Sequence, residues 1–221
     1  RLGSPYQGLH GFDSPGAGGF DPALTVMHAQ SHENDYAARR ELQHAMYFTR
    51  AGIGLLYTDG NYQAETLGES GGAFPRHSNT SFLGQWDDPR VPNLLYIHEQ
   101  FARGDQQGKW SDNDVVIYER VDKRENPSMT DGDGVILLFM LNDNYSAGQG
   151  RSFSTNFPAN AGGSDAYLYN YSTYGGPFFE WASNITNSSV IIPEGGYFAF
   201  SWKNPDPSNL WADSGGRPLT I

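Results

Sequence analysis

The sequence predicts two successive fold types, an α/β part with parallel strands and then an all-β part with antiparallel strands. In the first part, short apolar runs at residues 24–29 and 53–57 flank a stretch with helical periodicity, which is typical of a βαβ unit. In the second part, short apolar runs alternate with glycine-rich turns and no helical period is evident. This pattern favours an antiparallel β-sandwich. We place the boundary near residues 105–112, where the period changes.

The two apolar runs of the first part, LTVMHA and IGLLY, are continuous rather than alternating. This suits parallel strands that are covered on both faces. Between them, residues 36–49 fit a helix, because apolar and small residues recur at spacings of three and four. This stripe consists of Ala38, Leu42, Ala45, Met46 and Thr49. A further helix fits residues 92–103, with Pro92 at its start and Gly104 at its end.

The strands of the second part are short and separated by turns. They are predicted at residues 115–119, 134–141, 166–170, 189–192 and 197–202. Turn-forming segments such as Asn160-Ala161-Gly162-Gly163 and Pro193-Glu194-Gly195-Gly196 lie between them. Residues 204–221 are predicted to be a linker or a truncated tail.

Composition excludes several classes of function. The formal net charge is −11, with 14 basic and 25 acidic residues, so the chain lacks the basic face that nucleic acids and anionic membranes require. There is no cysteine, which excludes disulfides and thiolate metal sites. No apolar stretch reaches the roughly 18 residues of a membrane span. A neutral ligand such as a sugar meets no electrostatic penalty.

One motif follows the first predicted strand directly, Ala29-Gln30-Ser31-His32-Glu33-Asn34-Asp35. It resembles the fourth conserved region of glycoside hydrolase family 13, the α-amylase-like enzymes. The strand ending Leu55-Leu56-Tyr57, the segment LLYIHEQF at 94–101 and the segment IPEGGYFAF at 192–200 resemble the eighth strand, the eighth helix and the C-terminal sandwich of that family. The resemblance covers roughly residues 20–203.

This resemblance implies a more specific architecture and function. Residues 1–108 would form the end of a (β/α)8 TIM-type barrel, and residues 109–203 an antiparallel β-sandwich domain. The function implied is that of the C-terminal portion of a glycoside hydrolase that acts on α-glucans such as starch, glycogen and maltooligosaccharides by a retaining mechanism. Its nucleophile and general acid would lie on upstream strands, so the chain alone would be incomplete for catalysis.

The resemblance also assigns two residues at the rim of the barrel, where the chemistry of such folds takes place. His32 would bind the sugar next to the cleaved bond, and Glu33 would take the place of the family's third carboxylate as a catalytic residue. The family has Asp where this sequence has Glu33, which is one methylene longer. An interpretation without catalysis is a helix N-terminal cap, in which Ser31 or Asn34 satisfies free backbone N–H groups.

An aromatic-dense stretch supplies two further candidate substrate-binding residues, Tyr174 and Trp181. An exposed platform for stacking a glucan is one interpretation, and packing in the core of the sandwich, which we favour, is the other. The stretch also supports an alternative function, a non-catalytic carbohydrate-binding module with a degenerate barrel remnant.

Four other patterns have simpler interpretations. Gly68-Glu69-Ser70-Gly71-Gly72 matches a nucleophile elbow but lacks the flanking strand and helix, so we expect a loop. Asp131-Gly132-Asp133-Gly134 is expected to be a hairpin turn rather than a calcium loop. The histidines His28, His44, His77 and His98 lack zinc-site spacing. The pattern Asn-x-Ser/Thr occurs at Asn79, Asn144, Asn170, Asn184 and Asn187 and is expected to mark polar loops.

Partners and location follow from these expectations. No cofactor and no metal are expected within this chain, and any calcium would belong to the upstream part. The expected partners are an α-glucan or oligosaccharide and the upstream barrel segment, in the same or another chain, with no nucleic acid and no membrane. We expect an extracellular or periplasmic protein.

Overall fold

The computed structural model describes residues 9–15, 21–28, 40–55, 90–122, 135–154, 165–171, 178–183 and 189–201. The first part contains the 3-10 helix η1 (Pro22–Leu24), the strands β1 (Val26–His28) and β2 (Ile53–Leu55), and the helices α1 (Arg40–Thr49) and α3 (Arg90–Gln100). The second part contains β3 (Asp105–Ser111), β4 (Val115–Val121), β5 (Val135–Asn142), β6 (Arg151–Ser154), β7 (Asp165–Tyr171), β8 (Phe178–Ser183), β9 (Ser189–Ile192) and β10 (Gly196–Ser201).

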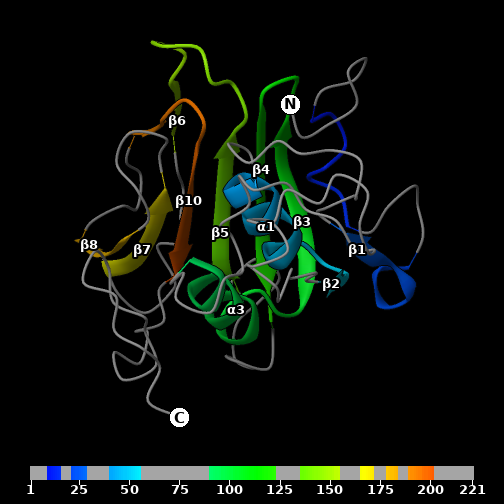
Figure 1. Ribbon diagram of the computed structural model, residues 1–221. Helices are drawn as coiled ribbons and strands as arrows, with labels where there is room; N and C mark the ends of the chain where they lie inside the picture. The colour runs from blue at the N-terminus through cyan, green and yellow to red at the C-terminus, as the bar shows by residue number, and fades with distance from the viewer. Residues whose placement is uncertain are drawn as a thin grey trace, which may run out of the picture.

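A six-stranded sheet in the order β3-β4-β5-β10-β7-β8 dominates the structure (Figure 1). Every neighbouring pair in it is antiparallel. A second, two-stranded sheet pairs β6 with β9, also antiparallel. The predicted antiparallel β-part is therefore confirmed within the residues that the structure describes.

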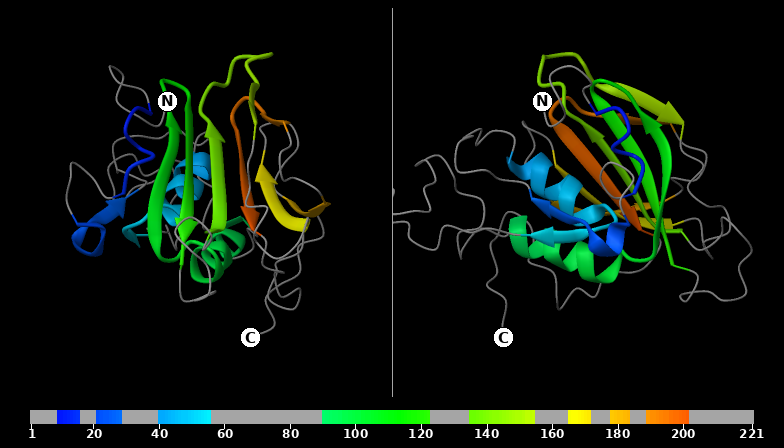
Figure 2. Two further views of the ribbon diagram at one scale, coloured as in Figure 1. Left: turned by 180° about the vertical axis from the view of Figure 1, so that it is seen from behind. Right: turned by 90° about the vertical axis from the view of Figure 1, so that its right-hand side faces the viewer.

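The helices α1 and α3 cover one face of the large sheet, as the edge-on view of Figure 2 shows. Alternation along β4 and β5 turns Val116, Tyr118, Leu137, Phe139 and Leu141 toward them. The helices contribute buried apolar residues to the same core, namely Leu42, Ala45, Met46, Phe48, Leu94 and Ile97. The predicted helical stripe is confirmed for its members from Leu42 to Thr49, which are all buried.

The opposite face of the large sheet packs against the small sheet. Val115, Ile117, Leu138, Met140 and Phe200 form its side of a second core. Ile192 of β9 is buried in this core, and Phe153 of β6 packs against it. The two sheets thus form a sandwich. The helices cover the face of the large sheet that points away from the small sheet.

The strands β1 and β2 are paired in parallel, with Val26 opposite Ile53 and His28 opposite Leu55. The predicted parallel neighbourhood of these two segments is therefore confirmed. The expectation that both strands are buried is wrong for Val26 and Ile53, which are 59% and 51% exposed. Val26 and Ile53 are register partners and therefore lie on the same face of this two-stranded sheet, so this face is only partly covered.

The second helix ends earlier than predicted, at Gln100 instead of residue 103. The backbone N–H groups of Phe101 and Ala102 both donate to the carbonyl oxygen of Ile97, which closes the last turn. Gly104 then takes a positive φ of 74°, which favours glycine. Among the described residues, no helix is long and apolar enough to cross a membrane.

Candidate functional site

The first candidate site lies at the carboxyl edge of β1 and β2. Parallel strands end at the same edge of a sheet, and here the last paired residues are His28 and Leu55. The entry to β1 is fixed by Asp21, whose side chain accepts a hydrogen bond from the backbone of Ala23 at 2.9 Å. The strand β1 ends at His28, and residues 29–35 follow it in the sequence, outside the described residues.

The structure leaves most of the predicted site residues outside its described part. His32 and Glu33 follow β1, and Tyr174 follows β7, but none of the three is among the described residues. Trp181 lies on β8, with its backbone paired to Tyr167 of β7, and its side chain is not described. The glycine-rich serine motif at 68–72 and the turn at 131–134 also lie outside the described residues.

The position of β2 depends on how helix α1 ends, because residues 50–52 join the two. The last four carbonyl groups of a helix have no partner within it. Here Nδ1 of His98 lies 2.6 Å from the carbonyl oxygen of Phe48. The hydroxyl of Tyr118 donates to the carbonyl oxygen of Met46 at 3.0 Å.

Two more side chains complete this anchoring. Arg120 of β4 donates to the carbonyl oxygens of Thr49 at 2.9 Å and of Gly104 at 2.7 Å. Gln106 of β3 accepts a hydrogen bond from the backbone N–H of Ala51 at 2.7 Å. We call His98, Gln106, Tyr118 and Arg120 the α1 clamp. It ties the turn before β2 to α3 and to the large sheet, and thereby fixes the amino-terminal end of β2.

Tyr118 and Arg120 of the α1 clamp are buried, and burial changes the proton affinity of both. Burial lowers the pKa of Arg120 to about 10, against the opposing influence of Tyr118 and Asp105. Burial also raises the pKa of Tyr118, although its hydrogen bond with Thr49 opposes this. At neutral pH the arginine is therefore charged and the phenol is neutral, which are the forms that donate the hydrogen bonds above.

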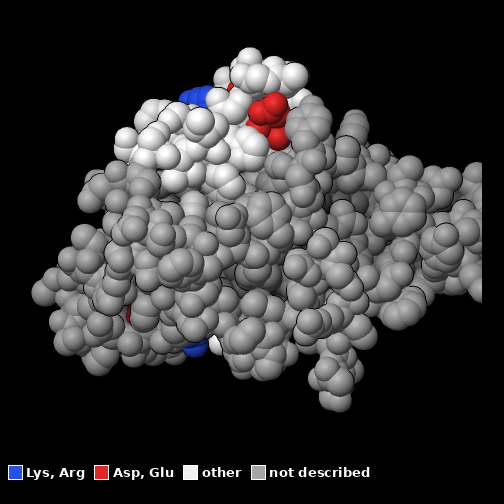
Figure 3. Space-filling view, turned by 90° about the vertical axis from the view of Figure 1, so that its left-hand side faces the viewer, with Lys and Arg blue, Asp and Glu red and all other residues white. Residues whose placement is uncertain are grey.

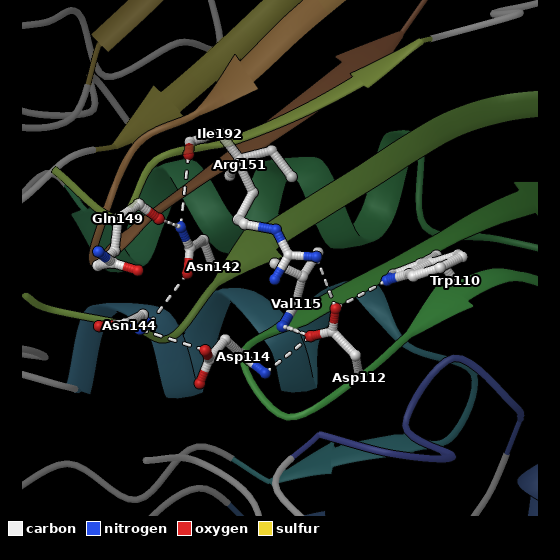
Figure 4. Close-up of polar contacts among 9 residues, drawn as sticks. All are labelled: Trp110, Asp112, Asp114, Val115, Asn142, Asn144, Gln149, Arg151 and Ile192. Atoms are coloured by element: carbon white, nitrogen blue, oxygen red, sulfur yellow. Dashed lines mark hydrogen bonds and ion pairs between the residues drawn. The ribbon is translucent and has the colours of Figure 1, made fainter.

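A second group of polar and aromatic side chains lies at the open edge of the sandwich, where β3 faces β6 (Figure 4). The indole Nε1 of Trp110 donates to Oδ2 of Asp112 at 3.0 Å. Arg151 donates to the same oxygen at 2.8 Å. The Trp110 ring meets the Phe153 ring edge-on, with centroids 5.9 Å apart. We call Trp110, Asp112, Arg151 and Phe153 the Trp110 patch.

Asp112 is the hydrogen-bonding centre of the Trp110 patch. Its Oδ1 accepts from the backbone N–H groups of Asp114 at 2.9 Å and Val115 at 2.8 Å. Partial burial alone would raise the pKa of Asp112, but the hydrogen bonds from these two groups, Trp110 and Arg151 lower it. Both carboxylate oxygens are thus occupied, so Asp112 positions its neighbours instead of contacting a ligand itself.

Asparagine side chains hold the loop beside the Trp110 patch (Figure 4). The fully buried Asn142 donates to the carbonyl oxygens of Gln149 at 2.9 Å and Ile192 at 3.4 Å. Asn144 donates to Oδ2 of Asp114 at 3.2 Å and accepts from the backbone of Ser146 at 3.0 Å. The strand β6, which carries Arg151 and Phe153, is thereby fixed to the end of β5.

The described residues contain no cluster of three or more acidic, histidine or cysteine side chains that could hold a metal ion. Of the histidines considered for zinc, His44 is buried and stacks on Phe48. His98 belongs to the α1 clamp. The described part of the surface in Figure 3 is mostly uncharged, with small acidic and basic areas.

Known proteins match this chain in structure alone. No protein-family model matches the sequence, and no curated protein matches it. The structure is similar to that of a beta-arabinopyranosidase, with a TM-score of 0.41 and 11% identity over 74% of this chain and 21% of that chain. It is also similar to pullulanase type I from Bacillus subtilis str. 168 complexed with maltose, with a TM-score of 0.47 and 12% identity over 87% of this chain and 30% of that chain. The chain spans less than a third of either, and at these values the similarity identifies neither a fold nor an activity.

Sequence reasoning did not single out the Trp110 patch. Asp112 and Arg151 are 39 positions apart, and the strand DQQGKWS lacks the apolar alternation by which strands are recognised. The one sequence feature that could have indicated the patch is Trp110 itself, a large aromatic residue in an otherwise polar strand.

Proposed function

We propose that this chain is the C-terminal portion of an α-amylase-like glycoside hydrolase that acts on α-glucans, with its nucleophile and general acid on strands outside this chain. The observation that carries the proposal is the parallel pairing of β1 and β2, with α1 between them in the chain. In such units ligands bind beyond the carboxyl ends of the strands, and the segment containing His32 and Glu33 begins there.

The exposed apolar side chains of the parallel pair support a barrel that other strands complete. Val26 and Ile53 are more than half exposed, and Leu24, in the helix η1 just before β1, is 81% exposed. Parallel sheets are normally covered on both faces, and two strands cannot close an eight-stranded barrel. We therefore infer that an upstream barrel segment, in the same or another chain, packs beside β1 and β2.

In this proposal, His32 and Glu33 act on the sugar ring next to the cleaved bond. His32 donates a hydrogen bond to a ring hydroxyl. The carboxylate of Glu33 stabilises the positive charge that develops on the ring in the oxocarbenium-like transition state. Retaining hydrolysis further needs a nucleophile and a general acid about 5 Å apart, which the upstream segment supplies.

The test is hydrolysis of maltoheptaose by the product of the whole gene. We expect Glu33→Gln to lower kcat by about a hundredfold or more, because charge stabilisation in the transition state is lost, and His32→Ala to lower kcat/KM. Glu99→Gln is the matched control, because it makes the same chemical change at an exposed position of α3. Equal kcat values for Glu33→Gln and Glu99→Gln would refute the role of Glu33. Binding of maltoheptaose without any hydrolysis would instead support the non-catalytic binding module.

A further inference from the structure

We propose that the Trp110 patch is a second carbohydrate-binding site, separate from the carboxyl edge of β1 and β2. The choice of an α-glucan as its ligand rests on the function proposed above. Trp110 is 47% exposed, and the Arg151 side chain is 39% exposed. The guanidinium carbon of Arg151 lies 5.7 Å from the centroid of the Phe153 ring. Trp110 is therefore the exposed end of a ledge that also contains the partly buried Phe153 ring and the partly exposed Arg151 guanidinium.

A β-bulge places Trp110 on this ledge. Gly108 pairs with Tyr118, but Trp110 pairs with Ile117, so that the register shifts by one residue at Lys109. Ile117 belongs to the core between the two sheets, and Trp110 consequently lies on the same face, at the edge strand and next to Phe153. Bulges commonly redirect one side chain at a sheet edge in this way.

The indole ring is held in place before any ligand arrives. Its N–H group is bonded to Asp112, which is itself fixed by two backbone N–H groups and by Arg151. A preorganised aromatic side chain loses little conformational entropy on binding. An exposed ring that is fixed in this manner is a platform rather than a mobile surface side chain.

The chemistry of the ledge matches a pyranose ring. The negative face of an aromatic ring attracts the aliphatic C–H groups of a sugar. Arg151 has five N–H donors, and within the described residues its hydrogen bond to Asp112 uses one of them. The remaining donors can reach hydroxyl groups at the rim of a ring stacked on Trp110. An apolar platform with a few fixed polar groups is typical of small-ligand sites.

Electrostatics and strand pairing disfavour other ligands. Asp112 and Arg151 neutralise each other, and the net charge of −11 repels nucleic acids. The bulge and the charged Lys109 protect the edge strand β3 against pairing with a strand of another protein. A neutral, polyhydroxylated ligand remains the best match.

The location suggests what the second site does. The Trp110 patch lies on the sandwich face of the large sheet, whereas α1 and α3 cover the other face. A glucan chain that is held at the Trp110 patch stays near the enzyme after each cleavage. Such tethering raises the effective concentration of long substrates and has no effect on substrates too short to reach both sites.

The test compares binding and hydrolysis in the product of the whole gene. Affinity electrophoresis in gels with soluble starch gives an apparent Kd, and we expect Trp110→Ala to raise it at least about tenfold. Trp110→Phe should restore part of the affinity, because it keeps an aromatic face. Ile191→Ala is the matched control, since Ile191 is an exposed apolar residue of the small sheet outside the patch. Thermal unfolding of each variant confirms that it is folded.

Hydrolysis of p-nitrophenyl maltotrioside separates this inference from the proposed function. We expect Trp110→Ala to leave kcat/KM on this short substrate unchanged. If the wild type cleaves neither this substrate nor maltoheptaose but is retarded by starch through Trp110, the proposed activity fails and the second site stands. Equal retardation of the Trp110→Ala and Ile191→Ala variants, or no retardation of the wild type, would overturn the second site.

Discussion

Replacing Arg120 by methionine tests how strongly the α1 clamp ties the parallel pair to the large sheet. Arg120 is 5% exposed and donates charge-assisted hydrogen bonds to two carbonyl groups, of Thr49 and Gly104. Such bonds contribute roughly 1.5–3 kcal/mol each. The pKa of Arg120 is lowered because burial penalises its charge. We therefore expect Arg120→Met to lower the free energy of unfolding by about 3 kcal/mol, which is the lower end of the sum for two such bonds.

Urea denaturation with linear extrapolation measures this loss as a change in the free energy of unfolding. In a thermal scan the same loss corresponds to a decrease of roughly 6–12 °C in Tm for a chain of this size. Arg151→Met is the matched control, because Arg151 is partly exposed and its ion pair with Asp112 should contribute less than about 1 kcal/mol. For Tyr118→Phe, the loss in the free energy of unfolding should lie between the losses for these two variants, at about 1–2 kcal/mol, since it removes one buried hydroxyl. If Arg120→Met and Arg151→Met cost the same, the α1 clamp does not stabilise the fold.

Three further predictions concern single positions. Gly104→Ala should lower the free energy of unfolding by more than about 2 kcal/mol, because φ is positive and a Cβ atom would collide with the backbone of Val121; a milder loss in urea denaturation would contradict this. The pKa of Asp112 is lowered in the fold, so its ionised form is stabilising at any pH above its ordinary value of 3.8, and this contribution should disappear as the pH falls below that value. A stability difference between wild type and Asp112→Asn that does not shrink as the pH falls from 5 to 2 would argue against it. Asn144 donates its side-chain amide to Asp114 and accepts from the backbone of Ser146, so Asn144→Ala should lower the free energy of unfolding by about 1 kcal/mol, and an unchanged value in urea denaturation would contradict this.

Elements with a strong apolar pattern could be predicted from the sequence. The strand Ser189–Ile192 has the predicted bounds, and α1 ends at the predicted Thr49. The parallel pairing of β1 and β2 was predictable because continuous apolar runs around a helix leave few alternatives. These are the cases in which local pattern and tertiary packing agree.

Other elements could not be predicted, because tertiary contacts determine them. The strand β3 is polar, since Gln106 faces the end of α1 and Lys109 pairs with Glu119 at the sheet edge. The strand β6 consists of Arg151–Ser154 alone, which is too short to show a period. The Trp110 patch combines β3 and β6, and neither the register shift at Lys109 nor the contact with Arg151 is encoded in local sequence.

The most direct measurement of the proposed activity is the anomeric configuration of the first product released from maltoheptaose by the product of the whole gene. Proton NMR during the first minutes distinguishes the two anomers before mutarotation mixes them. A retaining enzyme that acts on α-glucans releases the α-anomer first, and this release should depend on Glu33. Initial release of the β-anomer, or no release while the Glu33→Gln variant and the wild type bind the sugar equally, would contradict the proposal.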